Sequence, residues 1–321
     1  MRSYSFCTYF DHRYSPYGLA LYRSLVRHLE HFELFVLCYD DATVAILQGL
    51  GDSRIHIVPI ARLEQEDPAL VEANRDRTAV ERYFTCGPAW IRYAMRLSGA
   101  DVMTYLDSDL YFFNHPAPIF EELGERSILI IEHRFPDPLK HLAKNGIYNV
   151  GLVAFRNDDE GRRCVDWWRE RCLEWCYNRL EGDRFADQKY LDDWPTRFSG
   201  VVVLQNPGAG LAPWNVARYR LESNGQVTVD GFPLIFYHFT LFYRIVRGLY
   251  YLSIDDYGGQ LSAPLKRIYA AYIPEVEAMA RNVARVSPGR RYGFKDLFWL
   301  VRRGKSLSLK VGSRLWTLKR P

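Results

Sequence analysis

Short apolar runs of strand length alternate along the first 240 residues with segments whose apolar positions recur at helical spacing. This alternation favours parallel βαβ units with helices covering both faces of one sheet, so we predict an α/β fold. Gly87 and Pro88 open one of the helices, since proline is tolerated in a first turn. The predicted strands are 4–9, 32–39, 55–60, 102–106, 127–131, 147–155, 201–205 and 234–237, and the predicted helices are 19–31, 42–50, 86–97, 162–179 and one that opens at 185.

The strand at 102–106 ends in two acidic residues, Asp107 and Asp109. In an open α/β sheet, ligands bind at the edge where a strand gives way to its loop. Two like charges at a buried strand end are unfavourable unless a cation or tight hydrogen bonds compensate them. Mg²⁺ and Mn²⁺ favour oxygen ligands, and Mg²⁺ is often shared between carboxylates and substrate phosphates. The pair therefore suggests a divalent cation held between the protein and a diphosphate, although Asp-Ser-Asp can also simply begin a turn.

Composition indicates a globular protein of one large or two small domains, because 48% of the 321 residues are hydrophobic and 15% are aromatic. The first 14 residues lack the apolar core of a secretory signal, and no run of 18 apolar residues predicts a membrane span. The six cysteines form no Cys-x-x-Cys pair or zinc-finger spacing. We expect reduced thiols in a cytoplasmic protein.

The positive charge is concentrated at the C-terminus. Residues 281–321 contain 12 of the 42 Lys and Arg but one acid, Asp296, a net charge of +11, whereas the preceding 280 residues have 30 basic and 37 acidic residues, a net charge of −7. Large apolar side chains are interleaved with these cations. They are Tyr292, Phe294, Leu297, Phe298, Trp299, Leu300, Leu315 and Trp316. This pattern favours an anionic membrane surface as a partner; nucleic acid ranks lower because no nucleic-acid module accompanies the tail.

Four motifs in order resemble those of the nucleotide-sugar-dependent glycosyltransferases of the GT-A fold, and most closely the retaining family 8 group. The resemblance covers residues 4–244. Each motif is weak alone, and the ordered set is much more specific. The motifs are Thr8-Tyr9-Phe10-Asp11 followed by Tyr14, Leu106-Asp107-Ser108-Asp109, Tyr148-Asn149-Val150-Gly151, and Asp187-Gln188.

A fifth motif matches in part. The resemblance implies that His238 is a third metal ligand beside Asp107 and Asp109. The family has a glycine three residues later and a lysine six residues later, whereas this chain has Leu241 and Arg244. Arginine can still bind phosphate through its planar fork of donors. The chain is therefore a divergent relative, and no substrate transfers to it from the motif alone.

The resemblance implies the following roles. Mn²⁺ or Mg²⁺ would be bound by the two aspartates and His238, beside a diphosphate met by Arg244 and Ser108. Thr8, Tyr9, Asp11 and Tyr14 would bind base and ribose, and Arg92 is a further candidate contact unless it is an ordinary solvated helix charge. Asp187 would position donor-sugar hydroxyls, Gln188 would lie near the anomeric carbon, and Asn149 would contact donor sugar or acceptor.

Together these features predict a GT-A catalytic domain at 1–256, with a mixed, mostly parallel, Rossmann-like sheet flanked by helices, and a basic helical extension at 257–321. The predicted activity is metal-dependent transfer of a hexose from a UDP sugar to a saccharide or lipid-linked glycan, with retention as the family resemblance implies. The amide of Gln188 is a poor nucleophile, which favours a front-face transfer over a covalent intermediate. A sugar nucleotidyltransferase and a catalytically silent binding protein of the same fold are the alternatives. The predicted location is cytoplasmic, on the inner face of the membrane.

Overall fold

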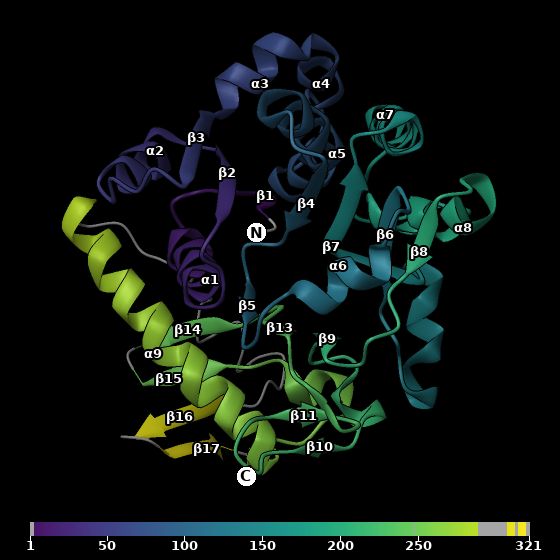
Figure 1. Cartoon of the computed structure of the whole chain (residues 1–321). Helices are drawn as coiled ribbons and strands as arrows, with labels where there is room; N and C mark the ends of the chain where they lie inside the picture. Colours follow the sequence, from purple (N-terminus) through teal and green to yellow (C-terminus); the bar gives the residue numbers. More distant parts are fainter. Residues whose placement is uncertain (1–2, 247, 288–306, 312–313, 319–321) are drawn as a thin grey trace.

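A seven-stranded sheet in the order β3-β2-β1-β4-β7-β6-β8 forms the centre of the protein (Figure 1). The structure is a computed structural model that describes residues 3–246, 248–287, 307–311 and 314–318. Strand β7 runs antiparallel to its neighbours β4 and β6, and the other neighbouring pairs are parallel. The predicted mixed, mostly parallel sheet is thus confirmed. The strands are β1 (Tyr4–Phe10), β2 (Phe32–Cys38), β3 (Ile55–Pro59), β4 (Val102–Leu106), β6 (Ile128–Glu132), β7 (Tyr148–Arg156) and β8 (Val201–Val203).

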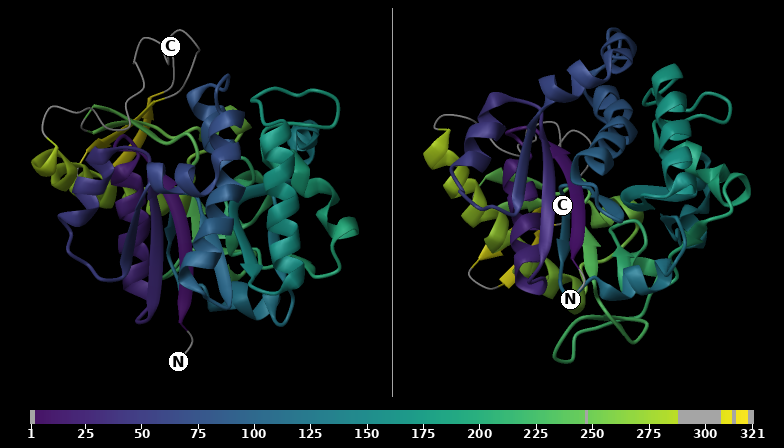
Figure 2. Two further views of the ribbon diagram at one scale, coloured as in Figure 1. Left: turned by 90° about the horizontal axis from the view of Figure 1, so that it is seen from above. Right: turned by 45° about the horizontal axis from the view of Figure 1, so that its top comes forward.

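Helices cover both faces of this sheet because its strands are apolar on both sides (Figure 2). In β1, Phe6 and Phe10 face one apolar core and Cys7 faces the other. The first core includes side chains of α1 (Ser15–His28), α2 (Asp41–Gln48), α6 (Ala117–Leu123) and α9 (Ala263–Val286). The second includes side chains of α3 (Ile60–Glu66), α4 (Pro68–Ala73), α5 (Ala79–Ser98), α7 (Asp159–Glu174) and α8 (Trp194–Arg197).

A smaller sheet in the order β5-β13-β9 packs side chains from one face into the first core and from the other face into a third apolar core. Its strands are β5 (Leu110–Phe112), β13 (Phe236–His238) and β9 (Ala209–Leu211). Because β5 follows β4 after only three residues, this sheet fixes the acidic turn between two buried strands. The remaining elements are η1 (Asp137–Asn145), η2 (Gln188–Asp193), η3 (Val216–Arg218), η4 (Ile254–Tyr257), β10 (Leu221–Glu222), β11 (Thr228–Val229), β12 (Phe232–Pro233), β14 (Tyr243–Val246), β15 (Leu249–Tyr251), β16 (Leu307–Val311) and β17 (Arg314–Leu318).

Several helix boundaries differ from the sequence prediction: α1 spans Ser15–His28 rather than 19–31, and α7 spans Asp159–Glu174 rather than 162–179. Helix α5 begins at Ala79 rather than at Gly87, because Thr78 and Glu81 cap its first turn reciprocally, and Pro88 lies inside the helix. The segment predicted as a helix from 185 forms the 3₁₀ helix η2 instead. The following Trp194-Pro195 pair starts α8, where proline is tolerated because the first amides of a helix have no acceptor within it.

The C-terminal extension contains strands as well as the predicted helix. Helix α9 packs beside α1, where Arg27 forms an ion pair with Glu275. Strands β16 and β17 extend the pair β14-β15 into a four-stranded sheet. Leu315 is buried in the third core, so it cannot contact a membrane as the sequence pattern suggested. The aromatic residues predicted to do so at 292–300 lie outside the described residues.

Leu241 has a backbone conformation that glycine would adopt with less strain. Its φ is +55°, in the left-handed region, and its side chain is 40% exposed. We expect Leu241→Gly to raise the free energy of unfolding by about 0.5–1 kcal/mol, as relief of strain exceeds the added entropy of the unfolded chain. Thermal unfolding measures this. Leu50→Gly, at a residue of 38% exposure and without positive φ, is the control and should destabilise; a loss of stability in both variants would contradict the prediction.

Candidate metal centre and the surrounding site

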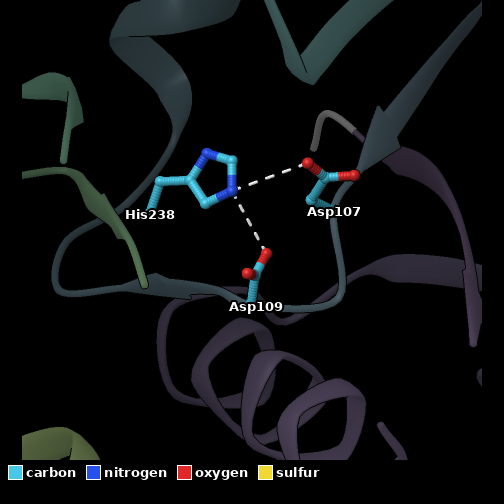
Figure 3. A group of neighbouring side chains, drawn as sticks. All are labelled: Asp107, Asp109 and His238. Atoms are coloured by element: carbon cyan, nitrogen blue, oxygen red, sulfur yellow. Dashed lines mark ion pairs between the residues drawn. The ribbon is translucent and has the colours of Figure 1, made fainter. Parts of the chain in front are cut away.

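Asp107 and Asp109 lie in the tight turn that joins β4 to β5. The amide of Asp107 continues the β4–β7 ladder by donating to the carbonyl of Gly151 (2.8 Å). The carbonyl of Asp109 accepts from the amide of Phe239 (2.9 Å), just after β13. Backbone hydrogen bonds therefore fix the main chain on both sides of the turn, and the two carboxylates point toward the same space (Figure 3).

His238 completes this cluster from a strand about 130 residues later in the chain. It is the last residue of β13 and pairs with Leu110 of β5, which places it beside the acidic turn. Its Nε2 lies 3.2 Å from Asp109 Oδ1 and 3.5 Å from Asp107 Oδ2. The three predicted metal ligands thus converge, with one ligand atom from each lying within 4.8 Å of the others.

The charges of the two carboxylates suit the cluster to bind a cation. Burial raises the pKa of Asp107; His238 opposes this shift, and Asp109 adds to it. Burial alone would lower the pKa of His238, but the charges of Asp109 and Asp107 hold it above its ordinary value. The acidic neighbours therefore favour the protonated form of the imidazole in the absence of a metal. Two carboxylate oxygens and one imidazole nitrogen form a donor set that Mn²⁺ and Mg²⁺ accept, so these residues fit the predicted ion.

Gly151 of β7 leaves room for the cluster. A Cβ atom at this position would lie 2.6 Å from Asn149 Oδ1 and 2.7 Å from His238 Nδ1, closer than real Cβ contacts. The β6–β7 register also shifts here, between Leu129 and Ile131. A close approach by side chains and an irregular ladder therefore both account for the glycine in the Asn-x-Gly motif.

We expect Gly151→Ala to weaken Mn²⁺ binding about 10–100-fold, because the added methyl group must displace His238 or Asn149 from its position. Isothermal titration of the metal-free protein with MnCl₂ measures the change. Gly87→Ala is the matched control, since its Cβ would lie at an ordinary contact distance of 3.8 Å from Asp187 Oδ2. Equal Mn²⁺ affinities for the two variants would contradict the steric explanation.

Asp187 and Gln188 lie at the start of η2, Asp187 at the N-cap position and Gln188 just after it. Ala186, with a φ of +47°, turns the chain just before them. Burial and the charge of Asp107 raise the pKa of Asp187 to about 8. The Gln188 side chain donates from Nε2 to the carbonyl of Asn145 (2.9 Å), which fixes its amide. Asp187 is thus a neutral carboxylic acid at pH 7 in the metal-free protein, close enough to Asp107 to sense its charge.

The predicted nucleotide-binding residues gather where β1 ends. Asp11 accepts from the amides of Arg13 (2.9 Å) and Tyr14 (3.1 Å) and from the Tyr83 hydroxyl (3.2 Å). The Tyr9 ring lies parallel to that of Tyr83, with 6.2 Å between centroids. Thr8 is buried, and its hydroxyl has no partner among the described residues. Tyr14 is 38% exposed, and burial together with Tyr243 and Asp109 raises its pKa.

The two predicted arginine contacts have protein partners. Arg92 donates from Nε to Asp166 of α7 (2.5 Å), so it is neither a solvated helix charge nor without a protein partner. Arg244 donates from Nε to Glu277 of α9 (2.6 Å). Ser108 is buried between the two aspartates. The motifs in the sequence selected these side chains as candidates, but they could not predict the partners that other elements supply.

A small recess beside His238 contains residues to which the sequence analysis gave no role. It is lined by Glu132, Asn149, Trp214 and His238, with Ile131, Leu152, Gly210 and Phe236 behind them. The Trp214 and His238 rings meet edge to face, 5.1 Å between centroids. Trp214 lies in a glycine- and proline-containing loop, a signal of irregular structure that does not specify a site.

Comparison with known proteins places this chain among relatives from Bacillus subtilis. No protein-family model matches it. YfnD of Bacillus subtilis strain 168, an uncharacterized protein, is 32% identical over 285 residues, which are 86% of this chain and 89% of YfnD. The chain belongs to the family of YfnD. YfnF of the same strain, also uncharacterized, is 34% identical over 254 residues, 75% of this chain and 82% of YfnF.

Solved structures resemble this member of the YfnD family more distantly. A galactosyltransferase, LgtC, in complex with donor and acceptor sugar analogs has a TM-score of 0.48 at 15% identity, over 74% of this chain and 87% of LgtC. Mouse xyloside xylosyltransferase 1 has a TM-score of 0.48 at 14% identity, over 75% and 98% of the two chains. The apo-form glycosyltransferase GlyE of Streptococcus pneumoniae TIGR4 has a TM-score of 0.49 at 15% identity, over 88% of this chain and 64% of GlyE. Similarities of this size assign no substrate.

Among the described residues of this YfnD relative, no helix combines the length and apolar character that a membrane span needs. The six cysteines are all buried and unpaired by disulfides.

Proposed function

We propose that this chain is a metal-dependent glycosyltransferase that moves a hexose from a nucleotide sugar to a hydroxyl group of a saccharide or lipid-linked glycan. The convergence of Asp107, Asp109 and His238 carries the proposal. These residues come from two sheets and meet at the end of a buried parallel strand, where α/β sheets bind ligands. The ordered motifs that resemble a family 8 glycosyltransferase support the same activity.

In this proposal Asp107, Asp109 and His238 hold Mn²⁺ or Mg²⁺, which when bound supplies a Lewis acid for the charge that develops on the leaving diphosphate. The imidazole gives up its proton to become a ligand. Ser108 borders the diphosphate. Arg244 would add positive charge there, and its pairing with Glu277 means that the guanidinium must share its donors between carboxylate and phosphate.

Asp187, Gln188 and Asn149 surround the proposed donor sugar. A neutral Asp187 both donates and accepts a hydrogen bond, which suits a sugar hydroxyl. The hydrogen bond to Asn145 directs the Gln188 amide. An amide is a weak nucleophile, so we favour a front-face transfer with retention of configuration over a covalent intermediate. The acceptor hydroxyl then attacks the anomeric carbon as the bond to the diphosphate breaks, and its proton passes to the departing phosphate oxygen.

Thr8, Tyr9, Asp11 and Tyr14 are the proposed contacts for base and ribose, with UDP as the nucleotide. The aromatic faces at this strand end suit a nucleobase, and Asp11 suits hydroxyl or amide donors. Arg92 remains a weaker candidate, because Asp166 already engages it. For residues 288–306 we retain the proposal of an anionic membrane partner, which suits a lipid-linked acceptor.

A panel of nucleotide sugars, incubated with the protein with and without Mn²⁺, tests this function. The expected result is release of UDP from one sugar nucleotide that requires the metal and is lost on chelation. Saturable binding of a nucleotide sugar without release or transfer would instead favour a catalytically silent binding protein. Formation of a sugar nucleotide from nucleoside triphosphate and sugar phosphate would favour the nucleotidyltransferase. No binding of any nucleotide sugar would overturn the proposal.

A further inference from the structure

His133 contacts two residues that line the recess beside the metal cluster, Asn149 and Trp214. It has no role of its own in the proposed chemistry. It follows β6 directly and is 7% exposed. Its ring lies parallel to Phe135, with 4.8 Å between centroids, and edge to face with Trp214 at 5.4 Å. The carbonyl of His133 accepts from Trp214 Nε1 (2.8 Å) and from the buried Asn215 Nδ2 (3.0 Å). Both the ring and the backbone of this residue are thus fixed.

Hydrogen-bond partners determine which ring nitrogen of His133 carries the proton. Nδ1 lies 3.1 Å from the carbonyl oxygen of Ile147, and a carbonyl can only accept, so Nδ1 must be the donor. Burial lowers the pKa of His133 to about 4, so the ring is neutral at pH 7. Nε2 is therefore an acceptor.

The side-chain amide of Asn149 provides a donor for His133 Nε2. Its Oδ1 accepts from the amide of Gly151 (2.8 Å), which can only donate, so this contact identifies which amide atom is the oxygen and which is the nitrogen. Its Nδ2 then faces His133 Nε2 at 3.4 Å, the long end of the hydrogen-bond range. One N–H of Asn149 is used in this contact. The second N–H has no acceptor among the described residues, and Asn149 lines the recess.

We propose that His133 is a positioning residue that fixes the Asn149 amide so that its remaining N–H donates into the recess, which selects a ligand presenting an acceptor oxygen there. Trp214, held by the carbonyl of the same histidine, forms the apolar wall. The recess has a volume of about 10 Å³, which is room for one water-sized group such as a single hydroxyl of a sugar. The inference rests on the proposed function, since it assigns the recess to a hydroxyl group of a bound sugar.

The tautomer test is independent of catalysis. Metal-free protein labelled with ¹⁵N-histidine is examined by NMR at pH 7, and His133 is assigned from the spectrum of His133→Gln. A protonated Nδ1 with a bare Nε2 is expected. A proton on Nε2 would overturn the proposal whether or not the protein is a glycosyltransferase.

A second test asks whether His133 acts through Asn149. It uses two substitutions of His133 that separate the contact with Ile147 from the contact with Asn149. Asparagine can reproduce the Nδ1 donor to Ile147 but not the reach to Asn149, whereas glutamine can reach Asn149. We expect His133→Asn to lower kcat for donor release about tenfold and His133→Gln to restore most of it. In an Asn149→Ala background, His133→Asn should have no further effect. An undiminished effect in that background would overturn the positioning role. If the parent protein released no donor but His133 had the expected tautomer, the proposed function would be refuted and the tautomer assignment would stand.

Discussion

Asp109→Asn is expected to lower metal-dependent UDP release by about 10²–10³-fold, because it removes one of two anionic ligands from the cluster. An amide oxygen can still coordinate, but it brings no charge to balance a divalent cation. Mn²⁺ affinity should fall together with the rate, and excess metal should recover part of the lost activity. Steady-state UDP release across a Mn²⁺ titration measures both effects.

Asp101→Asn is the matched control for this prediction. Asp101 lies just before the same strand at its opposite end and pairs with Arg156 at the surface (2.5 Å). An exposed ion pair of this kind contributes about 1 kcal/mol or less to stability, so its loss should leave the rate and the metal dependence unchanged. If Asp109→Asn kept a metal-dependent rate within twofold of the parent, the proposed metal centre would be wrong. Equal losses in both variants would indicate an effect on folding rather than on the metal.

Asp187→Asn is expected to abolish most donor turnover and to change how stability depends on pH. Burial gives the folded state a pKa of about 8 for Asp187, above the value of about 4 in an unfolded chain. Between these two values the unfolded state has released the proton and the folded state has kept it, so the stability of the parent falls as pH rises. Asparagine is neutral throughout. The stability advantage of the variant should therefore grow from pH 4 to pH 8, by up to about 1.4 kcal/mol per pH unit.

Denaturant unfolding of the metal-free proteins in EDTA, from pH 4.5 to 8, measures this difference. Asp193→Asn serves as the control, because Asp193 is 46% exposed and paired with Arg197, so its removal should shift stability by an amount that hardly varies across this range. Parallel pH curves for the parent and Asp187→Asn would show that Asp187 is ionised in the folded protein. The neutral carboxylic acid that we assign to the donor-sugar contact would then be excluded.

Local patterns determined much of this protein. The continuous apolar runs of β1 and β2 specified strands buried on both faces, because successive side chains point to opposite sides of the sheet. The acidic residues after β4 marked the ligand edge of the sheet for the same local reason. The start of α5 was misplaced because a Gly-Pro pair looks like a helix start wherever it occurs, whereas the capping box of Thr78 and Glu81 decides the boundary.

Only the tertiary structure decided which distant residues meet. The sequence contains eight histidines, and motif order singled out His238, but its distance from Asp109 depends on the pairing of β13 with β5. The same holds for the partners of Arg92 and Arg244, which come from helices α7 and α9. His133 and Trp214 carry no local signal of a site, since their roles depend on hydrogen bonds to carbonyl and amide groups that the chain brings near them only on folding. The spacing of apolar residues predicts which positions are buried and where strands end, because both depend on residues close together in the sequence. The site depends on residues that are far apart in the sequence and meet only on folding.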